Sequence, residues 1–184
     1  RSMFLGFYYT FSKLPEQPMA ARVADSRIGH FTRQQWNYTD DVSPFPRNYI
    51  VNRWRLDKKD PNAAMSEPVQ PIVYWLDKNI PVKYRAKVAE GVLEWNAAFE
   101  KIGFKNAIQV KQQQDNDEFD NNDTRHASVR WYVDTSDGAL AIGPSRTDPR
   151  TGEILDADIS FSDGWTRLPR RRAVEQLTSV AVEK

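Results

Sequence analysis

The sequence of 184 residues contains no cysteine, which excludes disulfide bonds, thiolate zinc sites and thiol nucleophiles. It contains only two histidines, His30 and His126, and they lie far apart along the chain. A serine triad therefore finds no support. No apolar run approaches the roughly 18 residues of a membrane-spanning helix, and the first residues lack the long apolar stretch of a signal peptide.

The charge is nearly balanced, with 26 basic and 25 acidic residues and a formal net charge of +1. This balance argues against a protein that binds nucleic acid through a basic surface. The basic cluster at residues 170–172 is therefore interpreted as the solvated start of a helix. A length of 184 residues suits one domain, or one domain with an appended segment, and a hydrophobic content of 40% suffices for a core.

Residues 71–104 predict a buried strand, a turn and an amphipathic helix. Residues 72–76 are all apolar, which is typical of a strand covered on both faces. After the turn, six large apolar side chains recur every 3.6 residues on average, so we expect them to share the buried face of a helix: Tyr84, Val88, Val92, Trp95, Phe99 and Ile102. Gly103 is placed to end this helix in a left-handed conformation. Gly91 indicates either a close approach of the helix to the sheet or a tolerated exposed glycine.

Apolar or alternating stretches predict strands at residues 4–11, 49–56, 107–111, 127–133, 139–143 and 154–161. Residues 12–47 are expected to form a long irregular connection, and residues 57–71 a linker. Residues 148–152 predict a turn with glycine in a bulge position, and residues 170–184 suit a modest helix. The strand–helix–strand order implies a parallel crossover. We therefore expect an α+β fold, with a mixed, twisted sheet of about five strands and a long helix packed on it.

Two groups of carboxylates are candidate sites. The first is the loop at residues 115–123, a candidate calcium site with His126 nearby; its members are Asp115, Asp117, Asp120 and Asp123. Their spacing is not that of a calcium-binding loop and no glycine is present, which favours a solvated loop. The second is Asp156 and Asp158, about 6.5 Å apart on one strand, a spacing compatible with acid–base catalysis. A strand with one solvated face gives the same pattern, and this interpretation is favoured.

Several stretches occur together in one order: RWRLDKKDP (53–61), EPVQPIVYW (67–75), EGVLEWNAAF (90–99), VRWY (129–132) and GPSRTDPRTGEI (143–154). With them, residues 47–161 resemble the large, mostly bacterial zinc-dependent metalloproteases whose catalytic domain is metzincin-like. The stretch DSRIGHF (25–31) resembles a segment that those proteins have just upstream.

The resemblance implies a division of the chain into three parts. Residues 1–60 are an aromatic-rich strand and loop extension, residues 61–169 a metzincin-like N-terminal subdomain, and residues 170–184 the start of a truncated helical segment. The resemblance also implies that a short edge strand above the cleft pairs with an extended substrate peptide. Its residues are Gly138, Ala139, Leu140, Ala141, Ile142 and Gly143. An ordinary short strand is the alternative.

The zinc signature of that family, H-E-x-x-H followed by G-x-x-H, does not occur in this sequence. Hence no catalytic or metal-binding residue is assigned, no zinc is expected on this chain, and the chain alone is expected not to hydrolyse peptides. The sequence is expected to be a piece of a longer zinc-dependent, secreted or periplasmic protease. The expected partners are a peptide or protein substrate and the missing C-terminal half of the catalytic domain, with no nucleic acid and no membrane span.

An alternative function belongs to another class. It is a non-catalytic module that binds a protein or a glycan through the same edge strand or through exposed aromatic side chains. This module would have a self-sufficient fold, whereas a protease fragment would expose an apolar sheet face on which the missing half packs.

Overall fold

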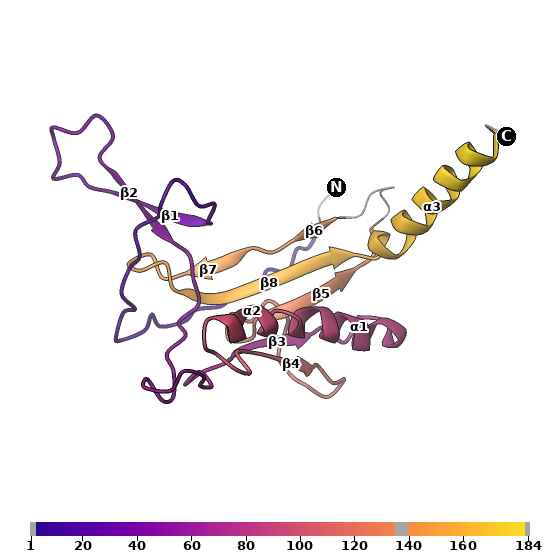
Figure 1. The fold of residues 1–184 in the computed structure, drawn as a ribbon, viewed down its shortest axis with the longest axis horizontal. Coiled ribbons are helices and arrows are strands. Elements are labelled where there is room, and N and C mark those ends of the chain that lie inside the picture. The colour runs from indigo at the N-terminus through magenta and orange to yellow at the C-terminus, as the bar shows by residue number, and fades with distance from the viewer. Residues whose placement is uncertain (1–2, 135–139, 183–184) are drawn as a thin grey trace.

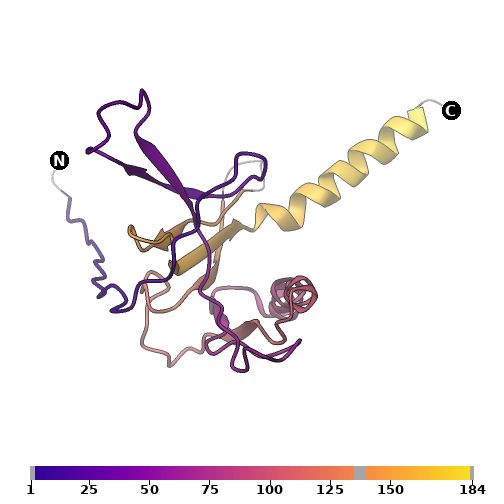
Figure 2. The same ribbon diagram turned by 60° about the vertical axis from the view of Figure 1, so that its left-hand side comes forward.

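The structure is a computed structural model and describes residues 3–134 and 140–182. Its main body is a six-stranded sheet with two helices on one face (Figures 1 and 2). The strands are β3 (Ile72–Leu76), β4 (Ile108–Gln112), β5 (Ser128–Tyr132), β6 (Ala141–Ile142), β7 (Ser145–Thr147) and β8 (Ile154–Ser162). Their order is β4-β3-β5-β8-β6, with β7 also paired to β8. β3, β4, β5 and β8 run parallel, whereas β6 and β7 run antiparallel to β8. The predicted α+β class with a mixed sheet is therefore confirmed.

The predicted helix is divided into α1 (Val82–Leu93) and α2 (Asn96–Lys101). Asn96 explains the break, because its side-chain amide hydrogen-bonds both the N–H and the C=O of Ile108 at 3.0 Å. The break changes the helical phase, so Trp95 and Ile102 are 64% and 65% exposed, and the prediction that both lie on the buried face was wrong. The other four apolar residues of the predicted face pack against the core.

The structure tests the roles predicted for two glycines, Gly103 after the helix and Gly91 within it. Gly103 has φ +86°, which confirms the left-handed conformation after the helix. A Cβ added at Gly91 would meet nothing within 4 Å. Gly91 is therefore a tolerated exposed glycine and does not mark a close approach to the sheet.

The core lies between α1 and the sheet face that α1 covers. Its buried members are Ile72, Tyr74, Leu76, Ile80, Ile108, Ala127, Val129 and Ala157. Burial of each large apolar side chain contributes roughly 1.5 to 3 kcal/mol to stability. On the other face of β3, Val73 and Trp75 are half-buried, so the strand predicted to be covered on both faces is only partly covered on this one.

The N-terminal region differs most from the predictions. Residues 4–11 form no strand, and their aromatic side chains are exposed, for example Phe4 and Phe11. In the part predicted to be irregular, β1 (Thr32–Trp36) pairs with β2 (Arg47–Val51) as an antiparallel hairpin. β1 was missed because four of its five residues are polar or charged and four are exposed, so no apolar alternation marks it.

An arginine clamp holds residues 15–20 against the rest of the chain. Three arginines each donate a hydrogen bond to a backbone carbonyl: Arg53 to Ala20 at 2.9 Å, Arg55 to Gln17 at 2.7 Å and Arg150 to Pro15 at 2.8 Å. Met19, within this stretch, is buried. The clamp therefore fixes an otherwise extended and exposed segment.

The last helix, α3 (Gly164–Val182), begins six residues before the predicted start at residue 170. Asp163 begins it, because its C=O accepts hydrogen bonds from both the N–H and the hydroxyl of Thr166. Figures 1 and 2 show α3 pointing away from the sheet. Among the described residues, no helix has the length and apolar character needed to cross a membrane.

Candidate functional site

The predicted peptide-binding strand lies at one edge of the sheet. β6 is antiparallel to β8, with Ala141 opposite Phe161 and Ile142 opposite Ser160. The C=O of Leu140 accepts a hydrogen bond from the N–H of Ser162 at 2.9 Å.

The backbone of this edge alternates between β8 and the outside. The C=O of Pro144 accepts a hydrogen bond from the N–H of Asp158 at 3.1 Å. Leu140, four residues before Pro144, bonds β8 in the same way. In an antiparallel pair such bonds come from alternate residues. Ala141 and Gly143 therefore direct their N–H and C=O groups away from β8, toward the position of a further strand.

Four of the six predicted substrate-binding residues lie on this edge: Leu140, Ala141, Ile142 and Gly143. All four are exposed. Gly138 and Ala139 lie outside the described residues. Within the described part of the chain, no strand pairs with the outer side of β6.

The two carboxylates on β8 are not solvated, so the favoured interpretation of this strand face was wrong. Asp156 and Asp158 are 1% and 4% exposed. They are covered because β7 places Arg146 opposite Asp156 in register. The Arg146 guanidinium forms ion pairs with both carboxylates, at 3.1 Å to Asp158. Ser128 on β5 donates a hydrogen bond to Asp158 at 2.6 Å.

This cluster joins one exposed guanidinium to two buried carboxylates. Burial, followed by the charge of Asp158, raises the pKa of Asp156, while Arg146 opposes the rise. On the other face of the sheet, burial raises the pKa of Tyr74 to about 12, and both carboxylates contribute to this shift. Because Arg146 forms ion pairs with both carboxylates at once, the cluster joins β7 to β8.

In the acidic loop, three of the four carboxylates hydrogen-bond residues two or three positions away in the chain. Asp123 is buried and forms an ion pair with Arg125, whose hydrogen bonds lower the pKa of Asp123 to about 2. Asp120 accepts from the N–H of Asn122, and Asp117 from that of Gln114. Across residues 3–134 and 140–182, no three His, Cys, Asp or Glu side chains gather in a group suited to a metal ion.

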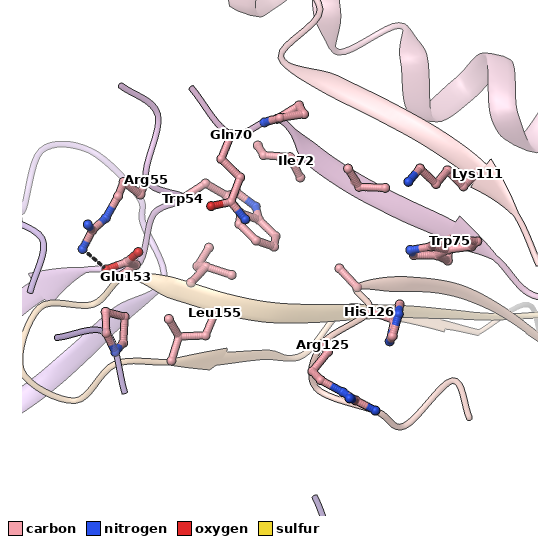
Figure 3. Close-up of a pocket in the computed structure, with 15 residues that line it drawn as sticks. Trp54, Arg55, Gln70, Ile72, Trp75, Lys111, Arg125, His126, Glu153 and Leu155 are labelled. Atoms are coloured by element: carbon pink, nitrogen blue, oxygen red, sulfur yellow. Dashed lines mark hydrogen bonds and ion pairs between the residues drawn. The ribbon is translucent and has the colours of Figure 1, made fainter. Parts of the chain in front are cut away.

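A polar pocket of about 500 Å³ opens on the face of the sheet opposite α1. Figure 3 shows Arg55, Glu153 and Gln70 toward one end, and Lys111 with Trp75 and His126 toward the other. Arg55 and Glu153 form an ion pair at 2.6 Å.

One family model matches the chain, a domain of unknown function named DUF5117, over residues 5–59. The match includes the clamped segment, β1 and β2, and ends before the sheet of β3 to β8. It covers 55 of the 184 residues. No curated protein and no solved structure matches the chain. The comparisons therefore describe the N-terminal extension and leave the function of the sheet to its geometry.

Sequence reasoning brought none of the pocket residues together. Trp75, Lys111 and His126 come from three separate parts of the chain and share no motif. The parallel register of β3 and β4 places Trp75 opposite Lys111, and the sequence carries no signal for this register.

Proposed function

We propose that this chain is the N-terminal part of a zinc-dependent metallopeptidase, and that its edge strand binds the substrate peptide. It would supply the sheet and the upper wall of the cleft. The observation that carries the proposal is the exposed edge at Leu140–Gly143. It is interpreted through the resemblance of residues 47–161 to metzincin-like proteases. This resemblance implies an edge strand at the same place.

An extended peptide adds to such an edge by main-chain hydrogen bonds. Ala141 and Gly143 offer the N–H and C=O groups that face outward. Ala141 has only a methyl group and Gly143 has no side chain, so the backbone is accessible to a close strand. Leu140 and Ile142, which are 56% and 61% exposed, offer apolar surface to alternate side chains of the peptide.

A second observation supports the proposal. An apolar groove of about 550 Å³ lies between the helices and the sheet. Its walls include Trp54, Tyr74, Val88, Val92, Phe99, Ile159 and Phe161, and Lys87 is its one charged residue. A protease fragment is expected to expose such a surface where the remainder of the domain packs.

Zinc would activate the water that attacks the peptide bond. The residues described here do not fit the metal, because they contain no group of three suitable side chains. The zinc ligands and the catalytic base are therefore assigned to a part of the protein outside this sequence. The role proposed for this chain is to bind and orient the peptide.

The first test is the native sequence after Lys184. An H-E-x-x-H motif with G-x-x-H, within roughly one further domain half, is expected. A native protein without this motif would overturn the protease proposal. The chain alone, incubated with zinc and casein, is expected to show no cleavage. Stoichiometric zinc binding with cleavage would instead contradict the assignment of the catalytic groups to another part.

The edge itself is tested with two N-methylated peptides of one sequence. One carries N-methyl groups on the alternate amides that would bond Ala141 and Gly143, and the other on the amides between them. Only the first is expected to lose binding, because N-methylation removes the inter-strand donors. Equal binding of both peptides, or no binding of the parent peptide, would remove the edge from the proposal.

A binding module remains the second candidate, because one aromatic group on the hairpin is exposed. Trp36 and Tyr38 stack with ring centroids 6.3 Å apart, and the Arg47 guanidinium lies 4.5 Å from the Trp36 ring centre. Stacked exposed rings suit a glycan or a protein surface. Loss of glycan or protein binding in a Trp36→Ala variant, with the parent edge peptide still bound, would favour this function.

A further inference from the structure

The sheet has a gap at the amino ends of its central strands. β3 pairs with β5 only through Trp75 and Leu76. β5 pairs with β8 from Ser128, opposite Asp158, onward. The first residues of β3 and of β8 therefore have no β5 residue between them. The polar pocket of about 500 Å³ lies in this gap.

One end of the pocket carries a cation beside an aromatic cluster. Lys111 Nζ lies 5.1 Å from the Trp75 ring centre. The His126 ring stacks on Phe119 with centroids 4.1 Å apart, and Trp75 meets both rings edge-on. These contacts fix the orientation of the rings before any ligand arrives.

Among the charged side chains described in the pocket lining, Lys111 is the cation that has no carboxylate partner. Arg55 pairs with Glu153, and Arg125 pairs with Asp123. Within the described residues, no carboxylate oxygen lies within 4.0 Å of Lys111 Nζ. An anion that enters the pocket therefore meets a positive charge that no acid already neutralises.

The remainder of the pocket lining suits the flat or apolar part of a ligand. Ile72 and Leu155 lie between the two ends of the pocket, with Trp54 beside them (Figure 3), and Val73 is also part of the lining. At the far end, Gln70 and the Arg55–Glu153 pair offer hydrogen-bond donors and acceptors. The arginine clamp holds Pro15 as an outer wall.

We propose that this pocket binds an organic anion, a carboxylate attached to an aromatic or similarly flat apolar body. The carboxylate pairs with Lys111, and the body lies against Trp75 and the apolar side chains of the gap. A volume of about 500 Å³ suits a ligand of the size of an aromatic amino acid or a short peptide end. A free aromatic acid and the C-terminal residue of a peptide share this chemistry. The site lies on the sheet face and does not depend on the proposed peptidase activity.

The experiment uses two acids and their neutral analogues. N-acetyl-phenylalanine and a tetrapeptide ending in a free phenylalanine carboxylate are titrated into the full chain by calorimetry and ligand-detected NMR. The corresponding amides keep the body and remove the charge. At least one acid is expected to bind saturably, with roughly tenfold or more higher affinity than its amide, because a charge-assisted hydrogen bond is lost in the amide. Binding of the free acid alone or of the peptide alone supports the site and identifies its source.

The matched variants are Lys111→Met and Lys101→Met. Both replace an exposed lysine with an uncharged side chain of similar length, but Lys101 lies on α2 and away from the pocket. Lys111→Met is expected to weaken acid binding roughly tenfold, and Lys101→Met to leave it unchanged. Equal affinities of acid and amide, or equal effects of the two substitutions, would overturn the proposal. Absence of saturable binding by both acids up to about 10 mM would do the same.

Discussion

Ser128 donates a hydrogen bond to Asp158 at 2.6 Å, between two buried residues that face each other in the β5–β8 register. Arg146 joins this pair to Asp156. One guanidinium thus faces two buried carboxylates, and the cluster carries a net negative charge when both are ionised. Such a cluster favours a single register between β7 and β8, and it makes the stability of the fold depend on pH.

Replacement of Asp156 with asparagine is expected to remove part of that pH dependence. Burial raises the pKa of Asp156 above its ordinary value of 3.8, so the folded state holds the proton more tightly than the unfolded state. This contribution to stability is present below pH 3.8 and is lost as the pH rises through the raised pKa. The Asp156→Asn variant should therefore match or exceed the wild-type free energy of unfolding at neutral pH. Urea unfolding at several pH values measures this difference.

An Asp115→Asn variant is the control for the Asp156 experiment, because Asp115 is exposed. It should follow the wild-type pH profile. A larger stability deficit for Asp156→Asn at neutral pH than at acid pH would contradict the assignment.

The contribution of Asp123 to stability is expected to change with pH in the opposite direction. Hydrogen bonds from Arg125 lower its pKa from 3.8 to about 2, so its contribution to stability is present above pH 3.8 and is lost as the pH falls toward 2. Asp123→Asn should lower the free energy of unfolding at neutral pH by about 1–2 kcal/mol, a value reduced for the exposure of Arg125. The deficit should shrink in acid. A deficit of the same size at all pH values would show that lost packing, and not the ion pair, is its cause.

The arginine clamp is tested by limited proteolysis. Arg53→Met removes the hydrogen bond to the Ala20 carbonyl, and the side chain forms no ion pair among the described residues. Loss of one such bond, worth about 1 kcal/mol, should raise the rate of subtilisin cleavage within residues 15–22 about fivefold. Arg27→Met is the control, because the exposed Arg27 forms its ion pair with the half-buried Asp25 in its own loop. Equal cleavage of both variants would mean that the clamp does not hold the segment.

The sequence predicts those strands whose apolar residues bury one face. β3, β4, β5 and β8 were found because their alternation or apolar content follows from packing against α1. The polar strand β1 has no such face and was missed. Residues 4–11 have strand composition, yet their aromatic side chains are exposed and none belongs to the hydrophobic core, so the prediction from composition was wrong.

In the candidate site, too, only the features that follow from a local sequence pattern or from the family resemblance were predicted. The edge at Leu140–Gly143 follows a local apolar stretch, and its position was predicted through the family resemblance. The burial of Asp156 depends on Arg146, which the register of β7 places above it after an irregularity in the pairing. The pocket at Lys111 depends on the late start of β5 relative to its neighbours. Register between distant strands has no local signal in one sequence, so neither feature was predicted.

The same glycine-to-alanine change at two positions should shift stability in opposite directions. Gly152 has φ +73°, and a Cβ there would lie 2.5 Å from the Val51 carbonyl oxygen. Gly152→Ala therefore strains the backbone and forces the turn away from β2, at a cost of about 2 kcal/mol or more. Gly91 is helical with open space around it, so Gly91→Ala should add about 0.5–1 kcal/mol by lowering the entropy of the unfolded chain. Thermal unfolding of both variants measures the pair of effects.

These two outcomes bear on how the N-terminal extension attaches to the sheet. Arg53 donates its backbone N–H to the Gly152 carbonyl, and Ile154 donates to the Arg53 carbonyl, so the turn at Gly152 connects the extension to β8. If the turn carries this connection, Gly152→Ala should also speed cleavage within residues 15–22, as Arg53→Met does, whereas Gly91→Ala should leave cleavage unchanged. A destabilised Gly152→Ala variant with unchanged cleavage would show that the clamped segment is held independently of the turn.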